Sequence, residues 1–528
     1  MRGMAAAVLA ATLFTLAFPT TEIAPLAFVA LVPLLVTMRT RTRWQRFRIG
    51  WLAGFLTELV LFRWIPFTLT AMTPLPDAVT WGMCLLYAAW HGLRIGVFLA
   101  LAEPVRRATL ARFAPLAPVA VAALYAMVEW LWPVIFPWAL GHAAWEIPGA
   151  SALLALQGVP LLTFVVALFN AAFSEAFIHR KALAHAHLLG PAVALGLVLV
   201  PAVLFAPSPT GESIRVAIVQ PNFTLAEKKG ATQATRKVLL ERLLGLVRQI
   251  PRDTFDLVIA SEGAFPMWWR LDADDPKAPM NAQLEATRRL QKAIAEGPHT
   301  HAVFGGLRVE PAPARISHNS AVHLGPDGTL LGHYDKQTLV PFSEYVPFSD
   351  IIPALRDIPG ISHLTPGETA CRFPIASKSL GHDLLVTCGI CYESMFPDKT
   401  RRDAGLARLL VNLTIDTWFG TSTAPRLHLM TQAARAAELG IPLVRSALTG
   451  ISGVVDGNGH LVAELPRDQP GVLDATVTLF DGDTVFRALG QFFAPFATAL
   501  CIALLVDAYR RRRLLFPLAN PPREEPPT

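Results

Sequence analysis

Three residues in the second half of this 528-residue chain have types that can do covalent chemistry together. Cys391 comes directly after an apolar run, and Glu262 and Lys336 each follow another such run. An apolar run that stops at a thiol is typical of a buried strand that presents a nucleophile. A cysteine attacks as a thiolate, a carboxylate can take the thiol proton, and a lysine can stabilise an oxyanion. If the ends of the three runs converge, the sequence predicts a Glu–Lys–Cys site.

The elements that must position these residues lie in a region of soluble composition, about residues 207–482, which a linker at 207–211 introduces. The runs that we predict to be strands are 214–219, 257–260, 302–309, 384–390 and 409–413. Helical patterns fall near 231–249, 281–296 and 426–439, and turn residues at 326–329 and 456–459 each predict a hairpin. Alternating strands and helices indicate a layered α/β domain, in which ligands usually bind at the ends of strands.

The rest of the chain is too apolar for an ordinary soluble protein, since 53% of all residues are hydrophobic, 16% are charged and the mean hydropathy is +0.42. Seven apolar segments precede residue 207, at 4–19, 22–38, 49–70, 79–102, 113–137, 151–178 and 188–206, and an eighth covers 484–508. Each is close to the ~20 residues that cross a bilayer. Because further spans follow at once, we interpret the first segment as an uncleaved anchor and not as a secretory signal.

Basic residues are confined to alternate loops between these segments. They follow the second, fourth, sixth and eighth spans, at Arg39, Arg41, Arg43, Arg46, Arg48, Arg106, Arg107, Arg112, Arg180, Lys181 and Arg510 to Arg513. The loops after the first, third and fifth spans have no Lys or Arg. The positive-inside rule therefore predicts that both termini are cytoplasmic and that the central region is extracytoplasmic.

These boundaries give four predicted parts. They are a membrane domain of seven transmembrane helices at 1–206, a catalytic domain at 207–482, an eighth helix at 483–509, and a tail at 510–528 that is basic and then rich in proline.

Several function classes lack support in the sequence. It has no zinc-type Cys/His spacing, no Walker loop and no GxGxxG pattern, so we expect neither a metal nor a cofactor. The five cysteines do not make a disulfide framework. The formal charge of +6 comes from clustered basic residues, and we expect no nucleic-acid partner.

The residues around the three candidates form longer motifs. Segment 334–347 reads YDKQTLVPFSEYVP, segment 390–393 reads ICYE, and segment 412–420 reads NLTIDTWFG. Together these motifs resemble the nitrilase superfamily. With seven predicted spans before them and one after, the chain is similar to the apolipoprotein N-acyltransferase family within it. The resemblance implies a polytopic α-helical membrane domain and an extracytoplasmic α/β nitrilase-like αββα sandwich.

The resemblance also implies roles for individual residues. Glu262 matches the general base, Lys336 the oxyanion stabiliser and Cys391 the nucleophile of the family. The positions that assist this triad are matched by Glu344, Tyr392 and Glu393. A helix that recurs in the family is matched by His428, Arg435 and Glu438, for which helix packing is at least as good an interpretation.

The implied reaction is a two-step acyl transfer in a bacterial inner membrane. The thiolate takes an acyl chain from a phospholipid, usually phosphatidylethanolamine, and forms a thioester. The α-amino group of the diacylglyceryl-modified N-terminal cysteine of an apolipoprotein then attacks the thioester. The implied partners are thus the phospholipid donor, the diacylated acceptor and the lipid bilayer, for an enzyme that we expect to be a monomer.

The sequence departs from the family pattern in several places. Ile415 and Leu448 stand where the family commonly has Asn, and Lys229 stands near an expected Trp. These departures leave open the donor head group, the acyl length and the range of acceptors.

Two other interpretations of the nucleophile remain open. Cys388 and Cys391 form a C-x-x-C, which suggests a membrane-tethered thiol oxidoreductase. However, residues three apart on a strand point to opposite faces, which disfavours their pairing. A tethered nitrilase-type amidase would use the same triad but transfer the acyl group to water.

Two charges lie inside predicted spans, Glu58 in the third and Arg94 in the fourth. At 1.5 Å per residue both are roughly 12–14 Å from the same membrane surface. An unpaired charge at that depth costs at least ~2–3 kcal/mol on insertion scales, so a partner is expected. The sequence therefore predicts a structural Glu58–Arg94 ion pair.

Overall fold

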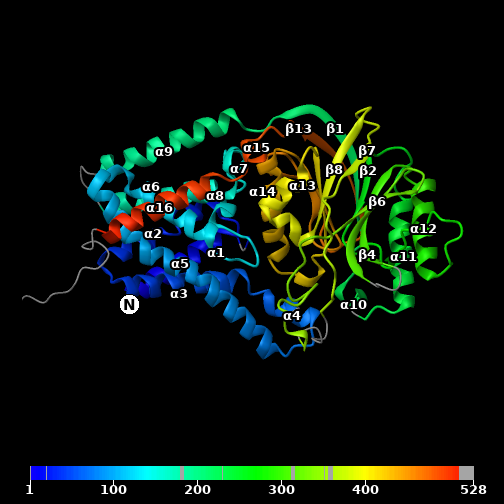
Figure 1. Ribbon diagram of the computed structural model, residues 1–528, viewed down its shortest axis with the longest axis horizontal. Helices are drawn as coiled ribbons and strands as arrows, with labels where there is room; N and C mark the ends of the chain where they lie inside the picture. The colour runs from blue at the N-terminus through cyan, green and yellow to red at the C-terminus, as the bar shows by residue number, and fades with distance from the viewer. Residues whose placement is uncertain are drawn as a thin grey trace, which may run out of the picture.

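The computed structural model describes residues 2–19, 21–178, 184–228, 230–310, 316–349, 351–354 and 361–510, and it has a helical domain beside a two-sheet domain (Figure 1). The helical domain consists of α1 (Arg2–Ala17), α2 (Val32–Thr37), α3 (Arg43–Leu61), α4 (Ile65–Met72), α5 (Asp77–Phe113), α6 (Ala117–Leu131), α7 (Ala150–Gln157), α8 (Val159–Ile178), α9 (Ala184–Leu204), α15 (Val485–Leu489) and α16 (Phe493–Arg510). The last two helices return to this domain after the chain has completed the sheets.

Within the described ranges, two helical stretches, Asp77–Leu131 and Val159–Ile178, are long and apolar enough to cross a membrane. The bent pair of α3 and α4 makes a third if it is counted as one span. Shorter apolar helices cover Arg2–Ala17, Ala24–Thr40, Leu188–Leu204 and Phe493–Asp507. Every one of these helices overlaps a predicted span, and the count of eight spans stays a prediction.

Three predicted spans are broken in the structure. The third bends by 49° between α3 and α4, where Pro66 in the first turn of α4 has no backbone N–H to donate. The sixth breaks between α7 and α8 at Gly158, whose φ is +72°. The eighth breaks at Gly490, with the same φ of +72°, between α15 and α16. A left-handed backbone at a glycine ends a helix at little cost, and hydropathy alone does not reveal it.

The first sheet has seven strands. They are β1 (Pro209–Gln220), β2 (Leu257–Ala260), β3 (Trp268–Trp269), β4 (His301–Val309), β5 (Ser317–Leu324), β6 (Leu330–Asp335) and β13 (Gly471–Phe480). Their order is β13-β1-β2-β4-β5-β6, with β3 paired to β4. β1, β2 and β4 are parallel, and the other neighbours along this order are antiparallel.

The second sheet has six strands in the order β12-β11-β10-β9-β8-β7. They are β7 (Phe373–Ala376), β8 (Asp383–Ile390), β9 (Leu409–Thr414), β10 (Leu443–Ala447), β11 (Ser452–Val455) and β12 (Leu461–Leu465). All five predicted strands are confirmed across the two sheets. The turns at 326–329 and 456–459 are also confirmed, because they join the antiparallel pairs β5/β6 and β11/β12.

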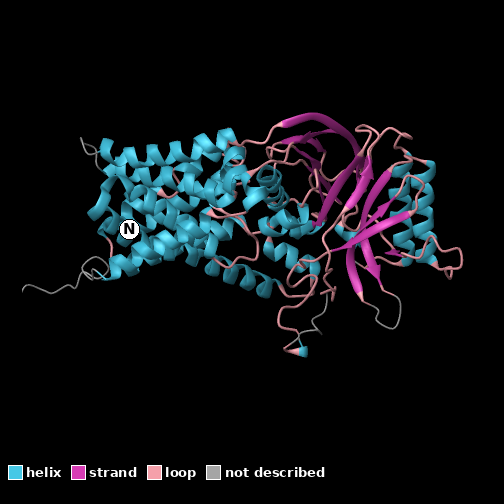
Figure 2. Ribbon diagram, turned by 45° about the horizontal axis from the view of Figure 1, so that its top comes forward, coloured by secondary structure: helices cyan, strands magenta, loops and turns pink. Residues whose placement is uncertain are grey.

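The two sheets pack face to face and are covered by helices on both outer sides (Figure 2). Apolar side chains of both sheets, such as Ile259 and Val411, form the core between them. Helices α11 (Gln233–Arg248) and α12 (Ala282–Glu296) cover the first sheet, and α13 (Pro397–Ala404) and α14 (Ala424–Leu439) cover the second. The predicted αββα sandwich is therefore confirmed.

The sandwich connects to the helical domain at two places. The predicted linker at 207–211 is shorter than expected, because β1 already begins at Pro209, which pairs with Phe480 at the end of β13. The chain thus enters and leaves the sandwich at neighbouring points. Helix α14 lies between the second sheet and the helical domain, and its apolar residues share one core with the membrane helices.

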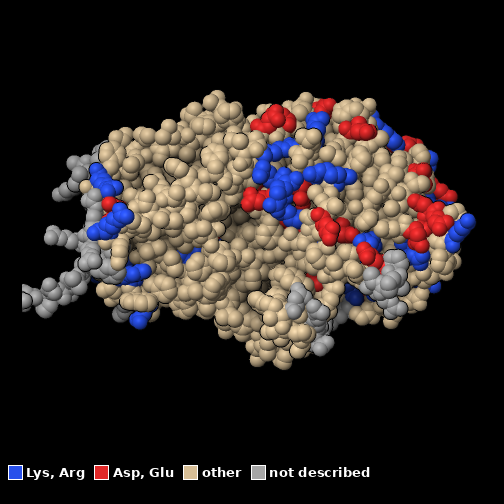
Figure 3. Space-filling view, viewed as in Figure 1, with Lys and Arg blue, Asp and Glu red and all other residues tan. Residues whose placement is uncertain are grey.

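Charges in the helical domain are concentrated at one end. Figure 3 shows Lys and Arg side chains at the end that points away from the sheets. Ion pairs there include Arg39–Glu175, Arg106–Glu103 and Arg112–Asp507. Nearer the middle, Arg94 Nη2 lies 3.1 Å from Glu58 Oε1 and both side chains are buried, which confirms the predicted pair.

Candidate functional site

The three sequence-predicted residues converge on one cavity. Glu262 lies just after β2, Lys336 directly follows β6, and Cys391 directly follows β8 and begins a short 3₁₀ helix, η6 (Cys391–Met395). All three line an open cavity of about 380 Å³. The strands bring these residues together because β2 and β6 belong to one sheet and β8 to the sheet packed against it.

Lys336 is buried and held between two carboxylates. Its Nζ donates a hydrogen bond of 2.9 Å to Glu344 Oε1 and lies 3.7 Å from Glu262 Oε1. Burial alone would lower the pKa of Lys336, but the carboxylates of Glu344 and Glu262 more than offset this and raise it above its ordinary value. Lys336 is therefore a cation at neutral pH, with its ammonium facing the cavity wall that carries Glu262.

Asn319 on β5 orients both carboxylates, and the sequence interpretation missed it. Its Nδ2 donates 2.6 Å to Glu262 Oε1 and 2.9 Å to Glu344 Oε1. Burial raises the pKa of Glu262, an effect that the Lys336 ammonium opposes. The signal that could have indicated Asn319 is the polar run at 317–320 in the first half of a buried strand.

Cys391 has a backbone that is uncommon for a residue with a side chain. Its φ is +53°, in the left-handed region, which typically costs of order 1–3 kcal/mol and occurs at functional sites. Its carbonyl oxygen accepts hydrogen bonds from Asn412 Nδ2 at 3.2 Å and Gln432 Nε2 at 3.3 Å. Burial and the nearby Glu262 raise the pKa of the Cys391 thiol to about 12. The resting thiol is thus protonated, and its activation needs a base.

Cys388 lies apart from Cys391, as their spacing on a strand predicted. Cys388 is buried in the core between the sheets, and its thiol contacts Cys371 rather than Cys391. Both Cys388 and Cys391 are free cysteines. This geometry disfavours a C-x-x-C dithiol as the reactive group.

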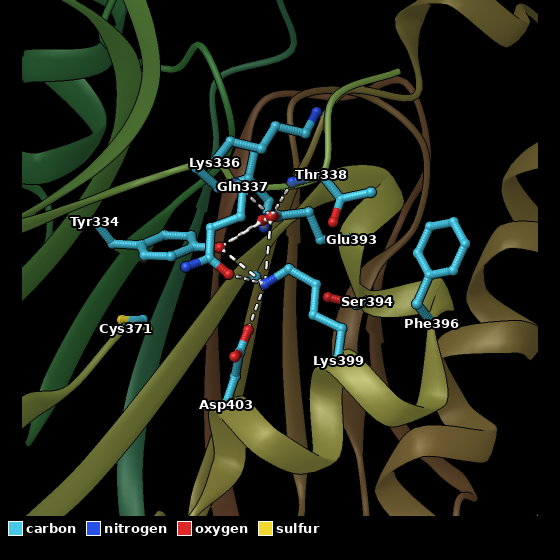
Figure 4. Close-up of polar contacts among 12 residues, drawn as sticks. Tyr334, Lys336, Gln337, Thr338, Cys371, Glu393, Ser394, Phe396, Lys399 and Asp403 are labelled. Atoms are coloured by element: carbon cyan, nitrogen blue, oxygen red, sulfur yellow. Dashed lines mark hydrogen bonds and ion pairs between the residues drawn. The ribbon is translucent and has the colours of Figure 1, made fainter. Parts of the chain in front are cut away.

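Glu393 connects the loops that carry Lys336 and Cys391 (Figure 4). Its carboxylate accepts hydrogen bonds from three backbone N–H groups, those of Gln337, Thr338 and Ile390. The phenol of Tyr334 also donates to it, at 2.9 Å to each oxygen. In Figure 4 the carboxylate lies at the centre of these contacts, with Lys399 on its other side at 3.5 Å. Glu393 therefore holds the loops of Lys336 and Cys391 together, and it does not itself line the cavity.

A buried ion pair supports the loop that carries Cys391, from the side of α14. Arg445 on β10 is fully buried, with Nη2 3.0 Å from Asp416 Oδ2 and Nε donating 2.8 Å to Gln432 Oε1. Gln432 in turn donates to the Cys391 carbonyl oxygen, so this network reaches Cys391.

The three residues of α14 that the family resemblance indicated lie in different surroundings. His428 lines the cavity and packs beside Asp416. Arg435 and Glu438 form a 2.7 Å ion pair, and Glu438 also accepts a hydrogen bond from the backbone N–H of Val159. The last two therefore join α14 to the start of α8, which is a packing role.

The helical domain supplies an apolar part of the cavity wall. Its residues there are Phe62, Trp64, Thr68, Ala71, Met72 and Phe136. Tyr392, next to Cys391, donates a hydrogen bond to the carbonyl oxygen of Ile135, and its ring contacts Phe136. The cavity is therefore shared by the two domains.

The departures from the family motifs differ in their relation to the cavity. Ile415 lines it, and Leu448 is fully buried in the core under α11 and α12. Lys229 lies outside the described residues, as do Arg180, Lys181 and the tail after Arg510.

Comparisons with known proteins cover both domains. Residues 215–484 match the carbon-nitrogen hydrolase family, and residues 10–172 match the apolipoprotein N-acyltransferase N-terminal domain. Apolipoprotein N-acyltransferases of Geobacter metallireducens and Gloeobacter violaceus are each 30% identical to this chain, over 96% of its length and 95% and 94% of theirs. A solved amidase from Nesterenkonia sp. is 20% identical and covers 52% of this chain and 93% of its own, with a TM-score of 0.37.

Proposed function

The chain belongs to the apolipoprotein N-acyltransferase family, and from this premise we propose that it moves an acyl chain from a phospholipid to the α-amine of a diacylated lipoprotein. In this proposal Cys391 is the nucleophile, Glu262 the general base and Lys336 the oxyanion stabiliser. Phosphatidylethanolamine is the preferred donor, and no cofactor takes part.

The first step forms a thioester. The Cys391 thiol gives its proton to the Glu262 carboxylate, and the sulfur bonds to the ester carbonyl carbon of the donor. The carbonyl oxygen becomes an oxyanion beside the Lys336 ammonium, which is already a fixed cation. The ester C–O bond then breaks, and Glu262 returns the proton to the oxygen of the leaving lysophospholipid.

The second step forms the amide. The neutral α-amine of the acceptor bonds to the thioester carbonyl carbon, and Glu262 takes one of its protons. The C–S bond breaks, and the Cys391 sulfur regains a proton from Glu262. The triad is then in its resting state, with a protonated thiol and an ionised carboxylate.

One observation carries this proposal: the cavity that holds the three residues is also lined by apolar residues of the helical domain, such as Trp64 and Phe136. Donor and acceptor are both anchored by acyl chains. Withdrawing such a chain from a bilayer costs ~0.8 kcal/mol per CH₂. A cavity that opens between membrane helices and the sandwich lets both lipids react while their chains stay in an apolar environment.

We place this cavity at the outer leaflet of a bacterial inner membrane, with the catalytic domain on the periplasmic side. The support is the position of the basic residues, which gather at the end of the helical domain away from the sheets (Figure 3). By the positive-inside rule that end faces the cytoplasm, where both termini would lie.

The test is to incubate the purified protein with phospholipid and a diacylated lipopeptide and to weigh the products. We expect the lipopeptide to gain one acyl chain, and we expect protein given phospholipid alone to carry an acyl adduct on Cys391. Cys391→Ala should give neither product, while the control Cys371→Ala should give both. An adduct on Cys388, or full transfer without Cys391, would overturn the proposal.

A hydrolase is the second candidate, because a nitrilase-type amidase passes through the same thioester and transfers it to water. The apolar cavity wall disfavours water as the acceptor. Release of free fatty acid without gain of mass by the lipopeptide would support hydrolysis instead.

A further inference from the structure

A second lysine lines the catalytic cavity and has no part in the reaction described above. Lys228 ends the short helix α10 (Leu225–Lys228), between the end of β1 and the start of α11. It shares the cavity wall with Glu262 and Gly263.

The Lys228 amine lies against the residue next to the proposed general base. A Cβ atom added to Gly263 would be 2.7 Å from Lys228 Nζ, so the amine packs directly over this glycine. The same Cβ would lie 3.1 Å from Ile415 Cδ1, so Ile415 packs over the same face of Gly263 as the amine. The wall beside Glu262 thus presents one cation next to an apolar side chain.

Among the residues that the structure describes, the Lys228 side chain has no hydrogen-bond acceptor and no ion pair, whereas the Lys336 side chain is hydrogen-bonded to Glu344. The nearby charges are Glu262, which attracts it, and Arg236, which repels it. Burial lowers the pKa of Lys228 to about 8. An ammonium in such a site is stabilised when an anion supplies a charge-assisted hydrogen bond.

The base of this side chain is fixed in place. The backbone N–H of Lys228 donates 3.1 Å to the Thr224 carbonyl oxygen, which closes the single turn of α10. Glu227 in the same turn lies 2.6 Å from Arg242 Nη2 and accepts the Thr224 backbone N–H at 2.9 Å. A cation on an anchored turn is preorganised to bind a ligand in one orientation.

We propose that Lys228 binds the phosphodiester of the donor phospholipid while the ester carbonyl lies at Cys391. This inference rests on the proposed acyl transfer. The phosphodiester is the anion that glycerophospholipid donors share, and the glycerol backbone separates it from the reacting ester. Both groups can therefore occupy the same cavity, the phosphate near Gly263 and the ester at the triad.

This assignment also gives the cavity a way to distinguish its two lipids. Donor and acceptor both have a glycerol backbone with acyl chains, but only the donor has a phosphodiester on it. Lys228 attracts the phosphate of the donor and finds no such anion on the acceptor. It therefore favours donor binding before the thioester forms and does not hold the acceptor at the same place.

The test compares two donors with the same acyl chains, phosphatidylethanolamine and diacylglycerol, in mixed micelles with the full-length protein. The rate of acyl-adduct formation on Cys391 gives kcat/KM for each donor. The loss of one charge-assisted hydrogen bond corresponds to about a ten- to hundred-fold lower kcat/KM. Lys228→Met should lower kcat/KM for phosphatidylethanolamine by this factor. The factor by which it lowers kcat/KM for diacylglycerol should be at least ten times smaller. Lys228→Arg should keep most of the preference for phosphatidylethanolamine, and the exposed control Lys237→Met should keep all of it.

Three results would overturn the inference. They are an equal loss with both donors, no loss with either, and a shift of the acid limb of the pH profile with diacylglycerol, which would mean that Lys228 acts through Glu262. A wild-type protein that forms no adduct with either donor would instead overturn the proposed function, so the two failures are distinguishable.

Discussion

The Glu393 carboxylate accepts a 2.7 Å hydrogen bond from the backbone N–H of Gln337, and this contact joins the loops of the proposed nucleophile and oxyanion stabiliser. Glu393 lies two positions after Cys391, and Gln337 directly follows Lys336. The same carboxylate accepts the N–H of Ile390, just before Cys391, at 2.9 Å. One buried side chain therefore fixes the separation of two proposed catalytic groups from different sheets.

The first prediction concerns this contact. Glu393→Ala should lower the melting temperature and slow adduct formation on Cys391, because it leaves three buried backbone N–H groups without an acceptor. Each unsatisfied buried group typically costs about 1–3 kcal/mol. Thermal unfolding in detergent and the adduct rate measure the two effects. Glu296→Ala, at an exposed position on α12, is the control and should change neither. Unchanged adduct formation in Glu393→Ala would show that the loop separation is set elsewhere.

The second prediction is the pH dependence of the proposed base. Glu262 must be ionised to take the thiol proton, and burial raises its pKa above the ordinary value of 4.5. The kcat/KM for thioester formation should therefore rise with pH through an acid limb that lies above pH 4.5. Glu262→Gln should lose this limb and about 10²–10⁴ in rate. Near-normal turnover of the variant with saturating lipid would contradict the assignment.

A third prediction follows from the hydrogen bond between Asn319 and Glu262. This bond favours the ionised carboxylate and lowers the pKa of Glu262. Asn319→Ala should therefore move the acid limb to higher pH than in the wild type, while Glu262 still takes the proton. An acid limb that moves to lower pH, or does not move, would mean that Asn319 serves only to pack the site.

The strand and helix patterns were sufficient to predict a layered α/β domain, and the resemblance to the nitrilase superfamily added the sandwich and the grouping of Glu262, Lys336 and Cys391. The three residues meet because each follows a strand and the strand ends of the two packed sheets line one cavity. The sequence could not predict Asn319 or Arg445. Both are polar residues inside strands, where a sequence does not say which buried charge they pair with. Lys228 was missed because its position depends on the contact with Gly263, which only the fold creates.

The sequence could not predict the breaks in the membrane spans, for a related reason. Gly158 and Gly490 interrupt segments whose hydropathy is continuous, and a glycine is tolerated inside many membrane helices. The Glu58–Arg94 pair was predictable because a buried membrane charge needs a partner and consecutive spans are neighbours. Glu129 provides a second carboxylate, 3.7 Å from Arg94 Nη1. This contact was not predictable, because Glu129 comes from α6, further along the chain.

The fourth prediction tests the proposed orientation. In a Cys391→Ala background, where the remaining four cysteines are buried, single cysteines can be placed at Asp327, Arg43 and Arg511. A membrane-impermeant thiol reagent added outside the inner membrane should label the probe at Asp327 and neither of the others. The reverse pattern would place the sandwich in the cytoplasm.

The last prediction concerns the charges inside the helical domain. Arg94 lies between two carboxylates, 3.1 Å from Glu58 and 3.7 Å from Glu129, and its guanidinium packs 4.6 Å above the Trp138 ring. Arg94→Gln should therefore destabilise more than Glu58→Gln, because it leaves both buried carboxylates without a cation. Thermal unfolding in detergent measures both losses.

The double variant Glu58→Gln/Arg94→Gln should lose less stability than the sum of the two single variants, since each single change already removes their contact. Residues in direct contact typically show coupling of about 0.5–3 kcal/mol, whereas distant sites add within about 0.3–0.5 kcal/mol. Glu58→Gln combined with Arg112→Gln is the matched control, because Arg112 pairs with Asp507 at the exposed end of the domain. That pair of changes should be additive. If the Glu58/Arg94 cycle is additive as well, Arg94 is held by Glu129 and Trp138 alone, and Glu58 does not contribute to its stability.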